Sequence, residues 1–300
     1  MGSLKIWLLE TRPQFLLLDP VCVFTGVAAS FYELHSINVL HLVLAFFGVL
    51  LSHISVNVLN DYFDYKSGID LRVKRTAFSG GSGMLPSGLL EPRKVFLLGM
   101  VSLCLVIPIG IYFITVYKWA ILPIGLYGVA VVYLYTPHIT KLPGLTEILG
   151  PGLGCGLWVL GPYFTQTGGY SAMAVVVTAI AGLLIANLLL LNEFPDVEAD
   201  RSAGRRHIPI IFGREKAAKV YCLLLASAYA LLLAGALAKI LPWLALLGLG
   251  TLPLGLKAMR GALRYHSDIS ALVPYLGTNV LVVLLTPLLM SLGIIVWAFV

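Results

Sequence analysis

Charged residues are scarce in this chain of 300 residues. Lys, Arg, Asp and Glu together make up 11% of it, hydrophobic residues make up 59%, and the mean hydropathy is +0.94. Soluble domains contain about 25% charged residues, so this composition excludes an ordinary soluble protein. We expect an all-α polytopic membrane protein in which residues 1–300 form a single membrane-embedded domain.

The chain also has few cysteines, and it lacks a signal-peptide cleavage site and nucleic-acid-binding motifs. The four cysteines are far apart and form no pair with metal-ligand spacing, so we interpret them as small buried hydrophobic residues. No small-residue cleavage site follows the first apolar region, so we expect no processing. The net charge of +6 then indicates basic loops near an anionic membrane surface or an anionic substrate, with no nucleic-acid partner.

Several apolar stretches are long enough to cross a lipid bilayer, since a spanning helix needs about 20 mainly apolar residues. We count nine, at roughly residues 14–32, 38–59, 95–115, 119–136, 145–164, 170–192, 217–238, 241–259 and 272–298. We expect nine transmembrane helices around a central chamber, arranged as two four-helix halves plus one helix.

The basic residues are distributed unevenly between the two sides that these stretches define. Of the 20 Lys and Arg residues, all but Lys118 and Lys239 fall on the side of the N-terminus. Lys and Arg concentrate in cytoplasmic loops. We therefore expect a multi-pass protein of the cell membrane with a cytoplasmic N-terminus and a C-terminus outside.

Half of the 14 carboxylates lie in two short polar clusters, which follow the second and sixth predicted spans on the cytoplasmic side. If the helices continue past the membrane edge, side chains four residues apart share a helix face. Motif 1 (residues 57–70) contains Asn57, Asn60, Asp61, Asp64 and Asp70, and motif 2 (residues 192–200) contains Asn192, Glu193, Asp196, Glu198 and Asp200. On this basis Asn60 and Asp64 share one face, and Asn192, Asp196 and Asp200 share another.

The side chains of both motifs offer amide and carboxylate oxygens, which suit Mg²⁺ better than zinc or copper. Basic residues stand beside each motif, and a Mg²⁺-bound diphosphate needs them whereas a metal alone does not. The alternative is that the motifs are solvated loop ends or helix caps. That alternative accounts for one cluster better than for two on the same side of a membrane.

The two motifs resemble the paired aspartate-rich motifs of the UbiA superfamily of intramembrane prenyltransferases. The resemblance lies in Asn60-x-x-x-Asp64 with Asp70, and in Asp196-x-x-x-Asp200-Arg201-x-x-Gly204-Arg205. Residues 11–13, 145–147 and 161–168 are similar to the 1,4-dihydroxy-2-naphthoate prenyltransferase branch in particular. The chain departs from that branch at His207, where Thr is usual, and in the loop 76–88.

The resemblance implies a prenyltransferase whose chamber opens sideways to lipid. Such an enzyme transfers an isoprenyl chain from a polyprenyl diphosphate, such as geranylgeranyl diphosphate, to an aromatic acceptor, here in menaquinone-type quinone biosynthesis. Carried onto this chain, the catalytic and Mg²⁺-binding residues are Asn60, Asp64, Asp196 and Asp200. The expected substrate-binding residues are Asn57, Asp61, Asp70 and Asn192, together with the basic residues Arg12, Arg72, Lys74, Arg201 and Arg205.

An allylic cation formed from such a donor needs aromatic faces and exclusion of water. Tyr62, Tyr65, Tyr133 and Tyr135 lie near the same membrane edge, and we expect Tyr133 to bind substrate; the alternative for these residues is an interfacial tyrosine belt. His53, one turn before Asn57, is placed to accept a proton from the acceptor, but we interpret it as a hydrogen-bonded interior histidine.

Other functions remain as alternatives. The prenyl chain could pass to a glycerol-phosphate ether lipid or to haem instead of an aromatic ring. A cation transporter is disfavoured because transporter sites usually lie near the bilayer midplane, whereas these carboxylates lie at span ends among Lys and Arg. A transferase of phospho-alcohol head groups would have one contiguous acidic stretch rather than two.

Overall fold

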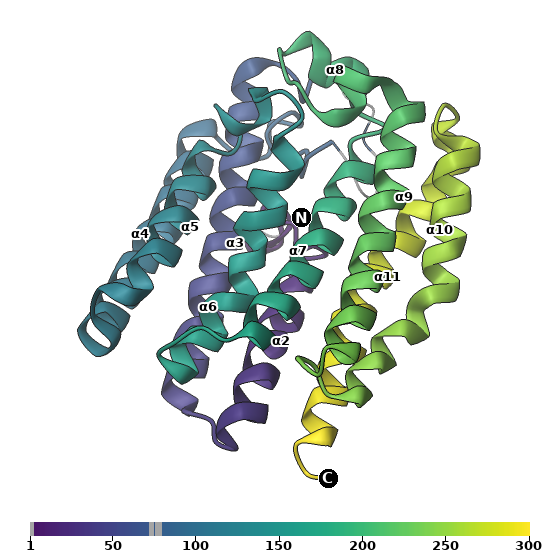
Figure 1. Ribbon diagram of the computed structural model, residues 1–300. Helices are drawn as coiled ribbons and strands as arrows, with labels where there is room; N and C mark the ends of the chain where they lie inside the picture. The colour runs from purple at the N-terminus through teal and green to yellow at the C-terminus, as the bar shows by residue number, and fades with distance from the viewer. Residues whose placement is uncertain (1–2, 72–74, 76–79) are drawn as a thin grey trace.

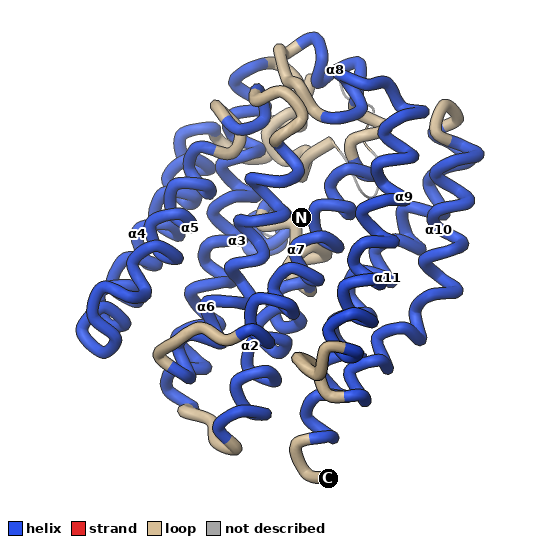
Figure 2. The backbone as a smooth tube through the Cα atoms, in the orientation of Figure 1, coloured by secondary structure: helices blue, strands red, loops and turns tan. Residues whose placement is uncertain are grey.

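The computed structural model describes residues 3–71, 75 and 80–300. Figure 1 shows these residues as a bundle of long helices joined by short loops. Within the described ranges no strand is present, and Figure 2 shows helix and loop only. The prediction of an all-α fold is confirmed.

The helices follow the apolar stretches of the sequence. In chain order they are α1 (Ser3–Glu10), α2 (Leu18–Leu34), α3 (Val39–Ser67), α4 (Pro92–Tyr117), η1 (Lys118–Ile121), α5 (Leu122–Leu134), η2 (Ile139–Lys141), η3 (Ile148–Cys155), α6 (Gly156–Thr167), α7 (Ala172–Asn192), α8 (Val197–Ser202), α9 (Ile208–Leu237), η4 (Trp243–Thr251), α10 (Leu252–Tyr265) and α11 (Ile269–Trp297). The π-helix η3 continues directly into α6, and the 3₁₀-helix η4 continues into α10.

Local sequence sets where the long helices begin and end. Asn38, Ser171 and Asp268 cap α3, α7 and α11, because each side chain accepts a hydrogen bond from a backbone N–H three residues later. Gly68 ends α3 with a left-handed φ of 78°, which glycine adopts without steric cost. The last turns of α3 therefore carry Asn60 and Asp64 of motif 1.

Five segments within the described residues are long and apolar enough to cross a membrane, which supports a multi-pass membrane protein. They are Val39–Ser67, Pro92–Leu134, Ala172–Asn192, Arg214–Leu237 and Ile269–Trp297. The second of these contains a reversal at Lys118, so that α4 and α5 run side by side (Figure 1). Shorter helices such as α2, with 17 residues, fall below this length. The count of nine membrane crossings therefore stays a prediction.

The centre of the bundle is formed by α2, α6, α7 and α11, which pack on one another. Small residues permit this close approach: a Cβ on Gly26 of α2 would overlap the carbonyl oxygen of Val159 in α6. Of the four cysteines, only Cys22 is buried here, whereas Cys104 on α4 is exposed. The short helix α8 lies across one end of the bundle, opposite the C-terminus (Figure 1).

Candidate active site

A cavity of about 940 Å³ lies inside the bundle. One face of α3 lines it from Ala45 through Val49, His53 and Asn57 to Asp64, a length of roughly 28 Å at the helical rise. The lining is apolar over the first half of this face and polar at its C-terminal end. The cavity thus combines a long apolar part with a compact polar end.

Motif 1 lies at this polar end. The amide of Asn60 donates hydrogen bonds to Asp64 Oδ2 at 3.0 Å and to Thr136 Oγ1 at 3.1 Å. The prediction that Asn60 and Asp64 share a helix face is confirmed. Asn57 also lines the cavity and donates from Nδ2 to the carbonyl oxygen of Thr11 at 3.1 Å.

Arg12 reaches the same place from the turn after α1. Its guanidinium donates to Asn60 Oδ1 at 3.0 Å and forms an ion pair with Asp61. The backbone of Arg12 has a φ of 54°, a left-handed conformation that bulky residues rarely adopt and that occurs at functional sites. Arg12 therefore lies beside motif 1, and its expected role in binding the diphosphate stays a prediction.

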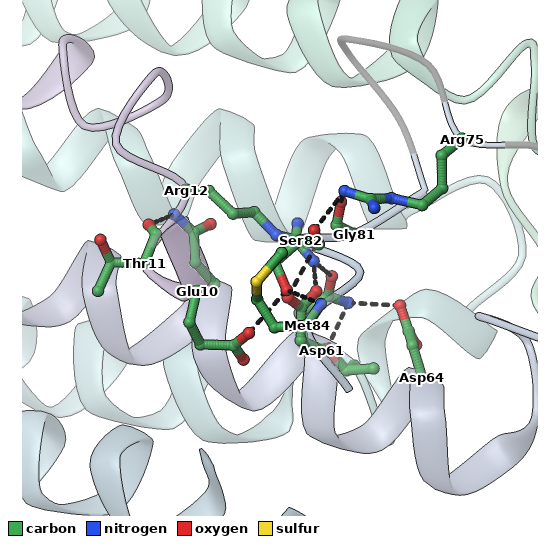
Figure 3. Close-up of polar contacts among 12 residues, drawn as sticks. Glu10, Thr11, Arg12, Asp61, Asp64, Arg75, Gly81, Ser82 and Met84 are labelled. Carbon is green, nitrogen blue, oxygen red and sulfur yellow. Dashed lines mark hydrogen bonds and ion pairs between the residues drawn. The ribbon is translucent and has the colours of Figure 1, made fainter. Parts of the chain in front are cut away.

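A glycine-rich loop, residues 80–83, closes over motif 1 (Figure 3). The backbone N–H of Ser82 donates to Asp61 Oδ2 at 2.9 Å, and its hydroxyl donates to Glu10 Oε2 at 2.6 Å. Arg75 donates to the carbonyl oxygens of Gly81 and Ser82. Asp61 is therefore engaged with Arg12 and this loop and does not line the cavity.

Motif 2 enters the cavity from the end of α7 and from α8. The expectation of one continuous helix is wrong here: α7 ends at Asn192 and α8 begins at Val197. Pro195 lies in the intervening turn, and a proline disfavours helical backbone in the residue before it. Asn192, Asp196 and Asp200 nevertheless all line the cavity.

Arg205 joins the two motifs. Its guanidinium pairs with Asp64 of motif 1 and, at 2.8 Å, with Asp200 of motif 2. Burial opposes the charge on Arg205, but the carboxylates of Asp64 and Asp200 outweigh that effect and raise its pKa. Burial also opposes the charge on Asp200 and so acts to raise its pKa. Arg205 and His207 outweigh this effect, and the pKa of Asp200 is lowered. Asp200 is therefore held ionised.

The donor chemistry of this polar end fits Mg²⁺. Within the described ranges no three His, Cys, Asp or Glu side chains form a ready-made metal cluster, and the arginine pairs hold the carboxylates instead. Mg²⁺ needs no such cluster, because it is usually bound by one or two carboxylates, waters and substrate phosphates. The buried Oδ1 of Asn192 has no hydrogen-bond partner among the described residues and is available as a ligand.

Among the remaining predicted site residues, Arg201 and Tyr133 do not line the cavity. Arg201 is exposed and pairs with Glu198 at 3.4 Å. Tyr133 is 40% exposed with its ring against Phe63, whereas Tyr135, two residues later, lines the cavity. Asp70 does line it. Arg72 and Lys74 lie outside the described residues.

Buried polar residues that the sequence did not single out as site residues complete this end. Glu193 and His207 line the cavity, and His207 Nδ1 lies 3.2 Å from Glu193 Oε1 and 3.4 Å from Asp200 Oδ2. Burial and the nearby Glu147 raise the pKa of Glu193 well above its usual range. For His207, its departure from the family pattern was the signal in the sequence that could have marked it as a site residue.

Comparison with known proteins identifies the family of this chain. Residues 21–281 match the UbiA prenyltransferase family. The chain belongs to this family. It is therefore an enzyme of the prenyltransferase class, as the motifs led us to expect.

Among UbiA proteins of assigned activity, this chain is similar to two bacterial 1,4-dihydroxy-2-naphthoate octaprenyltransferases. The protein of Bacillus subtilis is 27% identical over 93% of this chain and 88% of its own length. That of Haemophilus influenzae is 26% identical over 98% of this chain and 97% of its own length.

Solved UbiA structures share the fold. A UbiA homolog from Aeropyrum pernix K1 has a TM-score of 0.71 and 20% identity, over 94% of this chain and 98% of that one. A homolog from Archaeoglobus fulgidus bound to GPP and Mg²⁺ has a TM-score of 0.62 and 17% identity, over 95% of this chain and 99% of that one.

The ionisation of Asp70 gives a pH-dependent stability. Burial, followed by the charge of Asp64, raises the pKa of Asp70 from 3.8 to about 7. Between these pH values the folded protein binds a proton that the unfolded chain does not, so stability falls as pH rises. At pH 8, without Mg²⁺ or substrate, we expect Asp70→Asn to raise the melting temperature relative to wild type. At pH 4 the two should melt together, and an equal difference at both pH values would contradict the assignment.

Proposed function

We propose that this UbiA enzyme transfers an isoprenyl chain from a polyprenyl diphosphate to an aromatic acceptor of the 1,4-dihydroxy-2-naphthoate class, in menaquinone-type quinone biosynthesis. The proposal rests on the ion pairs that link the two motifs. Arg205 pairs with both Asp64 and Asp200 at the polar end of a long apolar cavity. A prenyl diphosphate has the same division, with a charged head and an apolar chain.

At the polar end, Asn60, Asp64, Asp196 and Asp200 would hold Mg²⁺, with Asn57, Asp61, Asp70 and Asn192 in support. Bound there, Mg²⁺ would supply charge that stabilises the leaving diphosphate. Arg12 and Arg205, both nearly buried, would donate charge-assisted hydrogen bonds to phosphate oxygens. We assign supporting contacts with the diphosphate to Arg72 and Lys74 as well, but not to Arg201, which is exposed outside the cavity.

The apolar part would hold the isoprenyl chain and keep water away from the reacting carbon. Its walls include Val49, Phe113, Ile124 and Leu157. Excluding water strengthens the arginine contacts at the polar end, because charges interact more strongly in a medium of low dielectric constant. Trp158 and Tyr135 line the cavity and offer aromatic faces to an allylic cation. Tyr135 takes the role that we first gave to Tyr133.

The acceptor class is supported by the full-length similarity to the two naphthoate octaprenyltransferases. A second acceptor class has some support: a digeranylgeranylglyceryl phosphate synthase of Halobacterium salinarum is 24% identical over 62% of this chain. The aromatic acceptor is favoured because the matches to the two naphthoate octaprenyltransferases extend over nearly the whole chain.

For the membrane arrangement we propose nine crossings with the N-terminus and both motifs on the cytoplasmic side. The crossings would be α2, α3, α4, α5, η3 with α6, α7, α9, η4 with α10, and α11. Support comes from the distribution of Lys and Arg, all but two of which fall on one side of this arrangement.

The activity is tested by incubating the purified protein with Mg²⁺, labelled geranylgeranyl diphosphate and either 1,4-dihydroxy-2-naphthoate or geranylgeranylglyceryl phosphate. We expect a prenylated naphthalene product, identified by mass spectrometry. Asp64→Asn should lower its rate of formation by about 100-fold, because it removes a charge from the polar end. Glu198→Gln is the matched control, since Glu198 belongs to motif 2 but is exposed and does not line the cavity.

Product formed only with the glycerol phosphate would overturn the aromatic acceptor. Release of no diphosphate with either acceptor would overturn prenyl transfer itself. Equal rates for Asp64→Asn and Glu198→Gln would remove Asp64 from the site.

The orientation is tested by cysteine labelling of sealed cells with a membrane-impermeant maleimide. Ser67→Cys replaces an exposed residue within motif 1, and Ser202→Cys replaces one just after motif 2. Ala238→Cys replaces an exposed residue at the opposite end of α9. We expect Ala238→Cys to be labelled from outside and the other two only after the cells are opened. The reverse labelling pattern would show that the orientation is opposite to the one proposed.

A further inference from the structure

A buried Asp–His pair lies in the apolar part of the cavity, away from both acidic motifs. Asp19 of α2 is fully buried, and its Oδ1 lies 2.6 Å from His53 Nδ1 on α3. Asp19 Oδ2 has no hydrogen-bond partner among the described residues. His53 lines the cavity, whereas Asp19 stands behind it.

This pairing fixes the chemistry of the histidine ring. The proposal takes Asp19 as ionised: a carboxylate then only accepts hydrogen bonds, so Nδ1 of His53 would carry the ring proton and donate a hydrogen bond to Asp19. In the neutral imidazole Nε2 then keeps its lone pair, and no described residue forms a hydrogen bond with it. The pair therefore presents a base to the cavity and places a carboxylate behind it to stabilise the imidazolium.

A charged residue in the interior of a membrane protein is costly and is retained mainly where it has a function. A second histidine on α3, His41, shows what a structural role looks like in the same helix. Its Nδ1 lies 2.7 Å from the carbonyl oxygen of Thr165 and its Nε2 lies 3.2 Å from the hydroxyl of Tyr112, and it does not line the cavity. His41 has partners at both ring nitrogens, whereas His53 has a partner at one.

The position of His53 suits the acceptor rather than the diphosphate. It precedes Asn60 by seven residues on the same face of α3, about 10 Å along the helix. That distance leaves room for the reacting carbon of the donor and one aromatic ring. Trp158 packs on His53 with ring centroids 4.6 Å apart and also lines the cavity, so it offers the ring a flat wall.

We propose that His53, positioned by Asp19, is the base that accepts the hydroxyl proton of the aromatic acceptor during prenyl transfer. The proposal rests on the function proposed above and deepens it, because it assigns the acceptor end of the cavity. This role requires an acceptor with an acidic aromatic hydroxyl. Asp19 is then a positioning residue, because it acts through His53.

In the proposed step, protons move between the acceptor, His53 and the diphosphate. The acceptor hydroxyl gives its proton to His53 Nε2, and the electron pair of that O–H bond makes the ring more nucleophilic. A ring carbon forms a bond to C1 of the donor while the C1–O bond breaks and its electron pair leaves with the diphosphate. An attacked ring carbon that bears hydrogen then loses that proton to the released diphosphate. An attacked ring carbon that bears the carboxylate instead loses CO₂, and the electron pair of that C–C bond returns to the ring. In both cases the imidazolium returns the first proton to the ring oxygen. His53 ends the cycle neutral.

The test uses the full-length enzyme in detergent with Mg²⁺, geranylgeranyl diphosphate and 1,4-dihydroxy-2-naphthoate. We expect His53→Ala to lower kcat by about 100-fold or more, as for loss of a general base, and to leave donor affinity unchanged. His41→Ala is the matched control and should keep wild-type kcat in the protein that remains folded. His53→Gln should be equally slow, because its amide can still donate a hydrogen bond to Asp19 but cannot act as a base. This variant replaces His53→Ala in the test if His53→Ala does not fold.

Chemical rescue separates a base from a space-filling side chain. Added imidazole should restore part of the kcat of His53→Ala, whereas pyrazole, which has the same shape but is a much weaker base, should not. Equal rescue by both compounds, or an unchanged kcat in His53→Ala and His53→Gln, would overturn the role of His53. A wild-type enzyme that neither binds geranylgeranyl diphosphate nor releases diphosphate would instead overturn the proposed function.

Discussion

The ion pairs of Arg205 with Asp64 and Asp200 hold the two halves of the site together. Asp64 stands at the end of α3, 141 residues away in the chain, and Asp200 stands on the short helix α8. Breaking such a buried pair usually costs about 3–5 kcal/mol, because it leaves a charge uncompensated. The arrangement of α8 and of the chain that leads into α9 depends on this contact. In the proposed function, the diphosphate would compete with Asp64 and Asp200 for the guanidinium of Arg205.

The remaining architecture places this charged contact at one end of an apolar cavity. The polar and apolar parts follow from the order of residues along one face of α3, from Ala45 and Val49 to Asn60 and Asp64. Arg12 and the loop 80–83 close the polar end from two other parts of the chain. In the proposed function, this single helix face would position the diphosphate, the reacting carbon and the acceptor in sequence. Along this face His53, with Asp19 behind it, lies in the apolar part of the cavity one helical turn before Asn57.

Much of this could be predicted from the sequence, because apolar stretches and clustered carboxylates are strong patterns in a chain with so few charges. The helical fold, the family and the meeting of motifs 1 and 2 at one cavity follow from them. Side-chain direction could not be predicted so well. Pro195 breaks the helix expected through motif 2, and the phase at the end of α5 directs Tyr135, not Tyr133, to the cavity. Asp19 was missed because a single carboxylate within an apolar stretch has no neighbour in sequence to mark it, and its partner His53 is 34 residues away.

The central claim is that motifs 1 and 2 bind one shared diphosphate. A double-mutant cycle measures this directly, with Asp64→Asn, Asp196→Asn and the double variant compared for their affinity for a non-reactive thio-analogue of geranylgeranyl diphosphate in the presence of Mg²⁺. If both carboxylates act on one ligand assembly, the losses in binding free energy should be non-additive, with a coupling of about 0.5–3 kcal/mol. Strictly additive losses, or a loss confined to one motif, would contradict a shared site.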